Sequence, residues 1–372
     1  MKGVYDTPRE EVPPGFLTIL DPKPARITPP QGIESSGRRT ALANILTDPE
    51  NPLTARVMVN RLWHYHFGRG IVGTPSDFGL KGERPTHPQL LDWLASDFIR
   101  SGWSLKHIHR LIMNSRTYQQ ASDFNEQNAR IDPEKKLLWR FPRQRLEGEV
   151  IRDSMLAVAG ELNLKMGGPS IFPELPPGMV SRGGWKVNED QSERNRRSVY
   201  VFVRRNTRYP MFETFDMPDT HESCPRRNVT TGPLQALTML NSKLTVEWAQ
   251  SFAGRVLAMA GEKRESQIEA AFRIAYSRRP DQTEKEIAKI FFDRQREIIR
   301  ARRYDDQPLA LPVKSATGID PGPRVSRPAA GANDTANGGS GDPRSEIDPV
   351  DGAALVDFCH ALINANEFVY RN

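Results

Sequence analysis

The sequence contains few cysteines and no long apolar run. Cys224 and Cys359 are the only cysteines among 372 residues, which excludes a disulfide framework and a four-cysteine zinc site. We expect two buried free thiols, with a single bridge between them as the alternative. No stretch approaches the roughly 20 apolar residues that a membrane-spanning helix needs. Residues 1–25 lack an apolar core, so we expect no signal peptide there.

Motifs that bind metals or cofactors are also missing. There is no Cys-x-x-Cys-His for haem attachment and no His-Glu-x-x-His for zinc. His64 and His66 are two residues apart, as are His107 and His109, and on a helix this spacing turns the rings about 200° from each other. Asp77-Phe78-Gly79 lacks the other loops of a kinase. We therefore predict no metal site and no cofactor.

Charge of one sign is only in modest excess. The 52 Lys and Arg residues exceed the 46 Asp and Glu residues and give a net charge of +6. That excess permits an anionic partner without requiring one. Hydrophobic residues make up 37% of the chain and charged residues 26%, which is typical of globular structure with exposed loops.

Proline- and glycine-rich segments divide the chain. Residues 1–37 contain repeated prolines and no periodicity, as in a linker that leads out of an upstream domain. Residues 304–349 contain almost no large apolar residue, which predicts disorder. We predict a leader at 1–37, a helical domain at 38–303 with sub-blocks 38–122, 132–260 and 262–303, a disordered insertion at 304–349, and a C-terminal helix at 350–372 that packs back on the domain.

Apolar residues at helical spacing predict a mainly α fold, with helices in layers and long irregular loops. We expect Gly68 to end one helix, and Ser104, Thr283 and Asp348 to lie at the starts of others. The predicted helices span residues 51–68, 87–118 as a helical hairpin, 143–162, 233–257 and 283–298.

Two local patterns give finer predictions. In the helix at 143–162, Leu146 and Val150 should face inward, while Glu149 and Arg152 should lie on a polar side as part of an ion network. Residues 198–204 alternate with apolar side chains on both faces, which predicts one strand buried between layers. We therefore expect a small β element near 197–205.

The best candidate site lies in residues 213–241, where polar residues precede a helix that starts at Pro233. A helix N-terminus offers unpaired N–H groups, so arginines and hydroxyls beside it suit a phosphate, sulfate or carboxylate. In the alternative, the acids and arginines pair with each other and Thr231 caps the helix. A nucleophilic Cys224, activated by nearby arginines, is a further alternative. The candidate ligand-binding residues are Arg226, Arg227, Thr230, Thr231, Asp216, Asp219, His221 and Cys224.

Several segments together resemble one protein family. They are the run from Asn51 to Val72, Ser76-Asp-Phe-Gly, Pro85-Thr-His-Pro-Gln-Leu-Leu-Asp-Trp-Leu, Arg197-Ser-Val-Tyr-Val-Phe-Val-Arg-Arg, Cys224-Pro-Arg-Arg-Asn-Val-Thr-Thr and Asn364-Ala-Asn-Glu-Phe-Val-Tyr. Over residues 38–300 and 350–372 the chain resembles domain of unknown function 1553, the C-terminal domain of planctomycete cytochrome c-domain proteins. The resemblance implies an upstream partner domain, a c-type cytochrome nearby and a place in the cell envelope or periplasm.

The resemblance and the missing catalytic motifs lead to one functional prediction. We expect a non-catalytic cell-envelope module that packs with an upstream, cytochrome-associated domain, with an anionic small molecule or glycan as a further ligand. A hydrolase that acts on an anionic or sulfated glycan through residues 213–241 is the alternative. Nucleic-acid binding through the hairpin at 87–118 is a second alternative, which the modest net charge disfavours.

Overall fold

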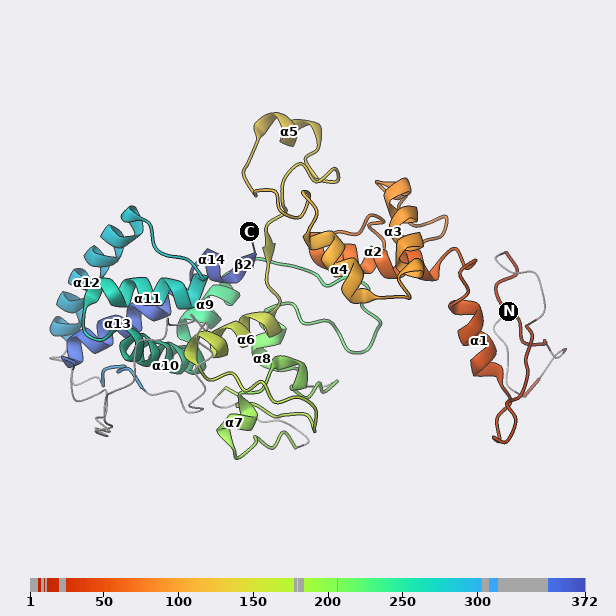
Figure 1. Ribbon diagram of the computed structural model, residues 1–372. Coiled ribbons are helices and arrows are strands. Elements are labelled where there is room, and N and C mark those ends of the chain that lie inside the picture. The colour runs from red at the N-terminus through yellow and green to blue at the C-terminus, as the bar shows by residue number, and fades with distance from the viewer. Residues whose placement is uncertain are drawn as a thin grey trace, which may run out of the picture. The chain divides into compact units, whose positions relative to one another are not determined.

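The computed structural model describes residues 6–7, 10, 12–19, 25–176, 179, 184–205, 207–302, 308–313 and 347–371. In these residues the chain is mainly helical, with one small antiparallel sheet (Figure 1). The predicted mainly α fold is therefore confirmed. The chain divides into two compact units, an N-terminal unit (Met1–Arg143) and a C-terminal unit (Gln144–Arg371).

The N-terminal unit is built on a helical core. Its helices are α1 (Arg38–Leu46), α2 (Thr54–Phe67), α3 (Pro88–Arg100), α4 (Leu105–Met113) and α5 (Glu126–Ile131). Gly68 ends α2 with a φ of 76°, and its N–H donates to the carbonyl of His64, as predicted for a left-handed helix cap. Ser104 caps α4 by accepting from the N–H of His107. Val59, Phe98 and Ile108 are among the buried residues that join α2, α3 and α4.

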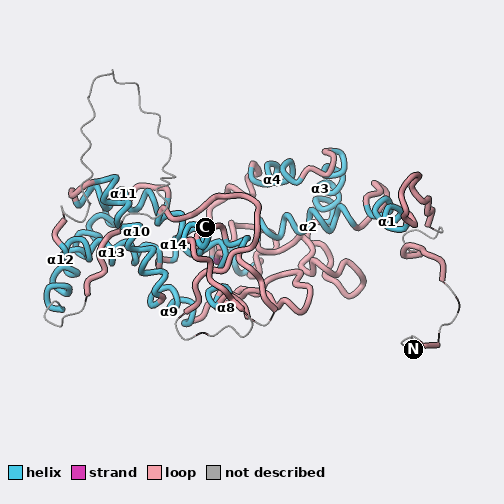
Figure 2. The backbone as a smooth tube through the Cα atoms, turned by 90° about the horizontal axis from the view of Figure 1, so that it is seen from below, coloured by secondary structure: helices cyan, strands magenta, loops and turns pink. Residues whose placement is uncertain are grey.

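The C-terminal unit holds the larger core. Its elements are β1 (Gln144–Arg145), α6 (Gly148–Ala159), α7 (Gln191–Arg194), a 3₁₀-helix η1 (Ser198–Tyr200), α8 (Pro210–Thr214), α9 (Pro233–Asn241), α10 (Lys243–Ala260), α11 (Arg264–Tyr276), α12 (Gln282–Arg302), α13 (Pro349–Ile363), α14 (Asn366–Val369) and β2 (Tyr370–Arg371). Helices α6, α10, α11, α12 and α13 share one continuous hydrophobic core. In Figure 2, α10, α11 and α13 lie side by side.

Helix α13 lies in the middle of this core. Asp348 accepts from the N–H groups of Val350 and Asp351, so it caps the helix as predicted. Buried residues occur around the whole helix rather than along one stripe, as expected for a helix that packs between others. After α13 the chain returns to β1, where Gln144 pairs with Arg371 and Arg145 pairs with Tyr370.

The predicted strand at 198–204 is wrong. Residues Ser198–Tyr200 form a 3₁₀ turn, and Val201 makes only an isolated bridge with Ile171. Val199, expected between layers, is 73% exposed. The turn is fixed from outside, because Asp153 accepts from the Ser198 N–H at 2.7 Å. Strand propensity depends on the neighbours available for pairing, and the sheet lies instead at 144–145 and 370–371.

The helix predicted at 143–162 is shorter than expected, and the residues that face the core differ from those predicted. It starts at Gly148, because Gln144 and Arg145 pair with the C-terminal strand. Val150 is exposed, whereas Ile151 is fully buried. Arg152, expected on a polar face, is 1% exposed. The apolar spacing fits more than one phase, and packing against α10 selects the observed one.

Other helix boundaries also differ from the predicted ones. The helix predicted at 233–257 is two helices, α9 and α10, which meet at Ser242. The capping pair of α12 is Asp281 and Glu284 rather than Thr283 and Glu286. Asp281 accepts from the Glu284 N–H at 2.7 Å, and Glu284 accepts from the Asp281 N–H at 2.8 Å. This reciprocal arrangement is a capping box two residues earlier than predicted.

Part of the insertion predicted to be disordered, residues 304–349, has a defined place in the structure, namely residues 308–313. They pack on α10, where the Val313 N–H donates to the Gln250 carbonyl at 3.1 Å and the Gln250 amide donates to the Leu311 carbonyl at 3.0 Å. Gly254 permits this approach, because a Cβ there would lie 1.9 Å from the Val313 carbonyl oxygen. Residues 303–307 and 314–346 lie outside the described residues.

Candidate functional site

Asp216 is the centre of a polar network at the start of the predicted site. Its carboxylate accepts from Arg145 Nη2 at 2.5 Å, from the Thr230 N–H at 2.9 Å and from the Thr230 hydroxyl at 2.8 Å. Its φ of 63° lies in the left-handed region, which Asp adopts more readily than most residues. Burial opposes ionisation, but the Thr230 donors and the Arg145 guanidinium together lower the pKa of Asp216.

Arg145, the cation that pairs with Asp216, is buried in the C-terminal unit. Its side chain is only 3% exposed, and its remaining donors reach the carbonyls of Thr230 at 3.1 Å and Leu146 at 2.9 Å. The guanidinium also lies over the ring of Phe215, 5.2 Å from its centroid. The alternative to anion binding pairs Asp216 or Asp219 with Arg226 or Arg227. The structure instead assigns Asp216 to a cation 71 residues earlier in the chain.

Arg227 belongs to a second ion-pair cluster. Its two terminal nitrogens donate to the two carboxylate oxygens of Glu149, at 2.8 and 3.0 Å, and Glu147 lies 3.3 Å away. The expectation that Glu149 serves in an ion network is confirmed, although Arg227 rather than Arg145 or Arg152 is its cation. Two-point arginine–carboxylate pairs are the stronger kind of charged hydrogen bond, so this cluster fixes the loop before α9 to the first turn of α6.

The remaining predicted residues lie at the surface. Asp219 accepts from the His221 N–H at 3.0 Å, and this contact lowers the pKa of Asp219. Cys224 is an exposed free thiol, contrary to the expectation of two buried thiols, and it donates to the Arg226 carbonyl at 3.2 Å. The Thr231 hydroxyl lies 3.2 Å from that of Tyr370. Arg226 is exposed and forms no ion pair with any residue that the structure describes.

The eight predicted residues therefore take part in separate sets of contacts. Asp216 and Thr230 meet in the Arg145 network, and Arg227 joins α6. The alternative pairing of Asp216 or Asp219 with Arg226 or Arg227 does not form, because Asp216 binds Arg145 and Arg227 binds Glu149; Thr231 does not cap α9, whose N-cap residue is Gly232. Asp216 and Arg227 attach this loop to residues 145–149.

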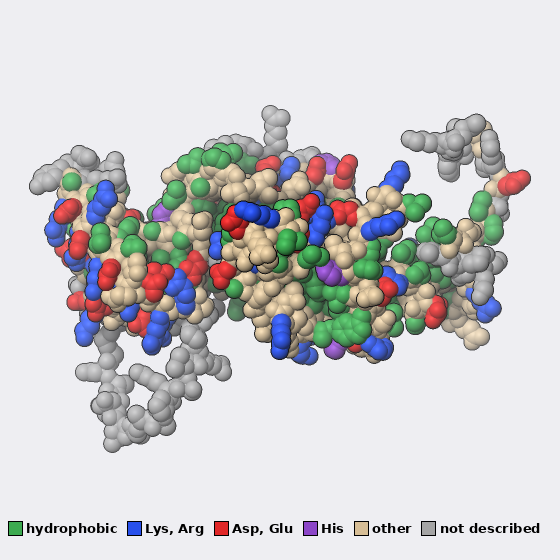
Figure 3. Space-filling model, turned by 90° about the horizontal axis from the view of Figure 1, so that it is seen from above, with side chains coloured by type: hydrophobic (Ala, Val, Ile, Leu, Met, Phe, Trp, Pro, Cys, Tyr) green, Lys and Arg blue, Asp and Glu red, His purple; other side chains and the backbone are tan. Residues whose placement is uncertain are grey.

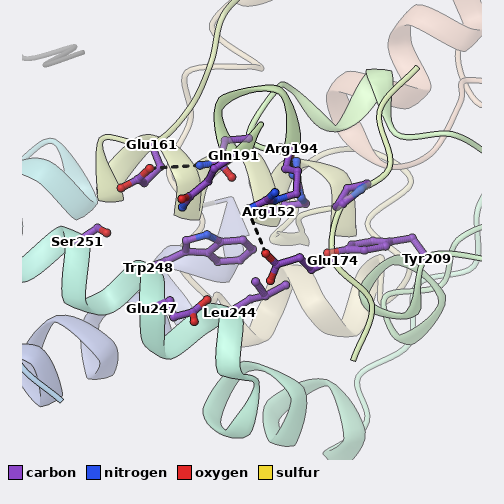
Figure 4. Close-up of a pocket in the computed structure, with 12 residues that line it drawn as sticks. Arg152, Glu161, Glu174, Gln191, Arg194, Tyr209, Leu244, Glu247, Trp248 and Ser251 are labelled. Carbon is purple, nitrogen blue, oxygen red and sulfur yellow. Dashed lines mark hydrogen bonds and ion pairs between the residues drawn. The ribbon is translucent and has the colours of Figure 1, made fainter. Parts of the chain in front are cut away.

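A separate cavity lies between α6, α7 and α10 in the same unit (Figure 4). Its volume is about 60 Å³, and none of the eight predicted residues lines it. Its lining residues come from segments far apart in the sequence: Arg152, Glu161, Pro173, Glu174, Gln191, Arg194, Asn195, Tyr209, Leu244, Glu247, Trp248 and Ser251.

Arg152 forms the floor of the cavity. Its guanidinium donates to the carbonyl of Arg196 at 3.0 Å, to the Ser198 hydroxyl at 3.1 Å and to the carbonyl of Arg194 at 2.6 Å. Burial lowers the pKa of Arg152 and raises that of the neighbouring Tyr209 phenol, an effect that Arg152 partly offsets. The Arg152 side chain thus holds residues 194–198 through these hydrogen bonds, and it also lines the cavity.

The walls carry charged and amide side chains. Arg194 Nη2 lies 3.3 Å from a carboxylate oxygen of Glu174, and Arg194 Nη1 donates to the Asn188 carbonyl at 2.7 Å. Asn195 donates to the buried Glu161 at 3.2 Å. Figure 4 shows the Trp248 indole between Gln191 and Glu247.

Sequence reasoning missed this cavity. Arg152 was assigned to a polar helix face, and no motif or spacing rule connects it with α7 or α10. The one local signal is on α10, where Leu244, Glu247, Trp248 and Ser251 follow helical spacing and therefore share a face. The site exists because tertiary packing places that face opposite α6 and α7.

Histidines from the two sequence pairs meet in the N-terminal unit. His66 Nε2 of α2 lies 2.8 Å from His109 Nδ1 of α4, a contact between helices that spacing within each pair could not predict. Among the described residues, no group of three or more His, Cys, Asp and Glu side chains is arranged to hold a metal ion.

The predicted helical hairpin forms from α3 and α4, but part of its basic charge is neutralised. Asp97 lies 2.7 Å from His107 Nε2 and 3.4 Å from an Arg100 nitrogen. In the C-terminal unit, basic and acidic side chains are interleaved over α11 and α12 (Figure 3), as in the 2.8 Å pair of Lys289 and Glu265.

Comparison with known proteins identifies a family. Residues 38–292 match the family PSD1, described as a protein of unknown function (DUF1553). No curated protein and no solved structure matches the chain. Within the described residues, no helix is long and apolar enough to cross a bilayer. The match spans more than half of the 372 residues and confirms the resemblance seen in the sequence, so the chain belongs to the PSD1 (DUF1553) family.

Proposed function

We propose that this chain is a non-catalytic module of the cell envelope that packs with an upstream, cytochrome-associated domain. The observation that carries the proposal is the pairing of residues 213–241 with residues 145–149. Asp216 is bound by Arg145 and Glu149 by Arg227. A general acid must hold a proton near neutral pH, whereas the Thr230 donors and the Arg145 guanidinium lower the pKa of Asp216 and favour its ionised form. The segment is therefore suited to holding a shape rather than to transferring protons.

An apolar surface beside this network supports docking. Leu234, Leu237 and Leu240 project from one side of α9 and are 71%, 50% and 49% exposed. Exposed leucines grouped on an ordered helix are typical of protein–protein contacts. The arginine pairs fix the loop that leads into α9, so the helix offers a preformed surface. The partner we assign to it is the domain that precedes this one in cytochrome-linked members of the family.

The direct test measures binding of the full chain to that upstream domain by isothermal titration calorimetry. We expect Leu237→Asp to weaken binding by about tenfold or more, because a charge is then desolvated at the contact. Ile290→Asp is the matched control, since Ile290 is also exposed, at 67%, and lies on α12 outside the proposed surface. Absence of binding by the native chain, or equal weakening by both variants, would reject the docking proposal.

A second test addresses the hydrolase alternative. The purified chain is incubated with chondroitin sulfate and heparin, and new reducing ends are measured. We expect none. Turnover that disappears in Asp216→Asn would overturn the non-catalytic assignment and place the reaction at the Asp216 network.

A further inference from the structure

Arg140, in the N-terminal unit, has one edge of its guanidinium group unpaired. Its Nη1 donates to the Ser122 carbonyl at 3.3 Å. Its Nε is buried without a hydrogen-bond partner, and its Nη2 contacts no acceptor in the part of the chain that the structure describes. The N–H groups of Nε and Nη2 lie on the same side of a guanidinium, where a carboxylate can accept from both at once. Arg140 therefore keeps an unused two-point site for a carboxylate.

A second unpaired group lies close to Arg140. The Ser122 hydroxyl is also buried without a partner, and the carbonyl of the same residue is the one that Arg140 binds. Buried polar groups are normally satisfied by protein, water or ligand. A hydroxyl and a guanidinium can both donate to an anionic oxygen. The two residues thus share the need for an acceptor.

Aromatic rings position the guanidinium. The Arg140 Cζ lies 4.8 Å from the ring centroid of Trp139 and 5.4 Å from that of Phe124. Contact with aromatic faces stabilises the charge of an arginine and leaves its N–H edges for hydrogen bonds. The indole of Trp139 is fixed in turn, because its N–H donates to the Asp132 carbonyl at 2.9 Å. The cation is therefore in place before a ligand binds.

The backbone beside Arg140 adopts an unfavourable conformation. Leu138 has a φ of 52°, in the left-handed region that bulky side chains rarely occupy. The Gln120 side chain holds this residue by donating to its carbonyl at 2.6 Å. Backbone strain of this kind is concentrated at binding and active sites, and here it occurs two residues before the unpaired guanidinium.

The charges of the same segment restrict the ligand. Two neighbouring cations are already paired, Arg130 with Glu126 at 2.6 Å and Lys136 with Glu134 at 2.9 Å. Arg140 forms no ion pair with any described residue. One unpaired guanidinium balances one negative charge, which favours a carboxylate over inorganic phosphate or sulfate.

Exposed apolar side chains restrict the ligand further. Phe124, Ile131 and Leu137 are 67%, 72% and 60% exposed, and no residue of α5, which carries Ile131, is buried. Grouped apolar side chains on an ordered surface are typical of protein–protein contacts. A carboxylate with an apolar neighbour gains from both features. An acidic side chain within a peptide has that neighbour, whereas a sugar acid is flanked by hydroxyls.

We propose that Arg140 binds an aspartate or glutamate side chain of a partner protein, with an apolar neighbour of that side chain packed on Phe124. Arg140 Nε and Nη2 donate to the two carboxylate oxygens, and the Ser122 hydroxyl turns to donate to one of them. The Phe124 ring is largely exposed, so it can shift to uncover Nε. The site lies in the N-terminal unit and does not depend on the leucine surface of α9.

An NMR titration of the full, ¹⁵N-labelled chain tests the site. The probe is acetyl-Leu-Glu-Phe-amide, and acetyl-Leu-Gln-Phe-amide is its neutral match. The indole N–H signal of Trp139, identified by its loss in Trp139→Phe, reports binding. We expect the glutamate peptide to shift this signal at millimolar concentration and the glutamine peptide to bind about tenfold more weakly. Glucuronate and inorganic sulfate at equal concentration should not displace the glutamate peptide.

Three variants separate the contacts. Arg140→Lys keeps the charge but loses the planar edge, so it should weaken binding of the glutamate peptide by about tenfold. Ser122→Ala removes only the hydroxyl and should weaken binding about threefold. Arg130→Lys is the matched control, because Arg130 is exposed and already paired with Glu126, and it should bind like the native chain. Melting temperatures show whether each variant remains folded.

Four results would overturn the proposal. They are no binding of the glutamate peptide, equal binding of the glutamine peptide, displacement by glucuronate or sulfate at equal concentration, and native binding by both Arg140→Lys and Ser122→Ala. Weakening by Arg130→Lys as large as that by Arg140→Lys would likewise show that general positive charge, and not the Arg140 edge, attracts the peptide.

Discussion

Arg227 and Glu149, 78 residues apart in the sequence, form a two-point ion pair with nitrogen–oxygen distances of 2.8 and 3.0 Å. Together with the contact between Arg145 and Asp216, it joins the segment between α8 and α9 to β1 and to the first turn of α6. Glu149 also lies in the first turn of α6, where the helix dipole favours a carboxylate. The stability of this segment therefore depends on a few charged contacts.

Replacing Asp216 with Asn should destabilise the chain. Asn tolerates the left-handed backbone but leaves the buried Arg145 without its counterion. We expect the free energy of unfolding to fall by about 2–4 kcal/mol, measured by urea denaturation. Asp219→Asn is the matched control, because Asp219 is exposed and its carboxylate accepts from the His221 N–H of the same loop, and it should change stability by less than about 0.5 kcal/mol. Equal effects of the two substitutions would contradict a central role for Asp216.

The lowered pKa of Asp216 leads us to expect that its contribution to stability depends on pH. The pKa of Asp216 is lowered in the folded chain, so its stabilising contribution is present above the unfolded pKa of about 3.9 and is lost as pH falls through the folded value. The stability difference between the native chain and Asp216→Asn should therefore narrow on going from about pH 6 to about pH 3. Urea titrations at both pH values check this, and a constant difference would show that Asp216 does not titrate as described.

Anion binding by residues 213–241 should depend on Arg226 rather than Arg227. Arg227 is already held by Glu149 and Glu147, whereas Arg226 is exposed. If sulfate raises the melting temperature of the native chain, Arg226→Ala should abolish the rise. Arg227→Ala should lower the melting temperature without sulfate and keep the sulfate-dependent rise. A rise that survives Arg226→Ala would exclude this residue as the anion ligand.

Gly254→Ala should release residues 308–313 from α10. Alanine normally favours a helix interior over glycine by about 1 kcal/mol, but here its Cβ would meet the Val313 backbone. We expect the free energy of unfolding to fall by about 1–3 kcal/mol. Hydrogen exchange should become faster at the Val313 amide, which in the native chain donates to the Gln250 carbonyl. Ala258→Gly, at an exposed position of α10, should cost about 1 kcal/mol and leave exchange at Val313 unchanged.

The two thiols should react very differently. Cys224 is exposed, whereas Cys359 is fully buried in α13, and burial raises the pKa of its thiol. Titration with a chromogenic disulfide reagent should therefore detect one thiol in the native chain and two after denaturation in guanidinium chloride. Cys224→Ser should remove the native signal. Two reactive thiols in the native chain would show that α13 opens readily.

Local chemistry made part of the fold predictable. Gly68, Ser104 and Asp348 end or start helices as expected, because a cap acts on backbone groups within a few residues. Helical periodicity likewise predicted a mainly α chain. The strand prediction at 198–204 failed, since alternation describes side chains and not whether a partner strand is present to pair.

The sequence by itself determined the family, the helical character and the presence of acids, arginines and hydroxyls between α8 and α9. Only the tertiary structure decided that Asp216 belongs to Arg145 and Arg227 to Glu149, and that Arg152, Tyr209 and Trp248 enclose a cavity. The physical reason is the distance along the chain over which each kind of interaction acts. Caps and periodicity act over one or two helical turns, whereas ion pairs and cavities depend on which distant side chains packing brings within a few ångströms.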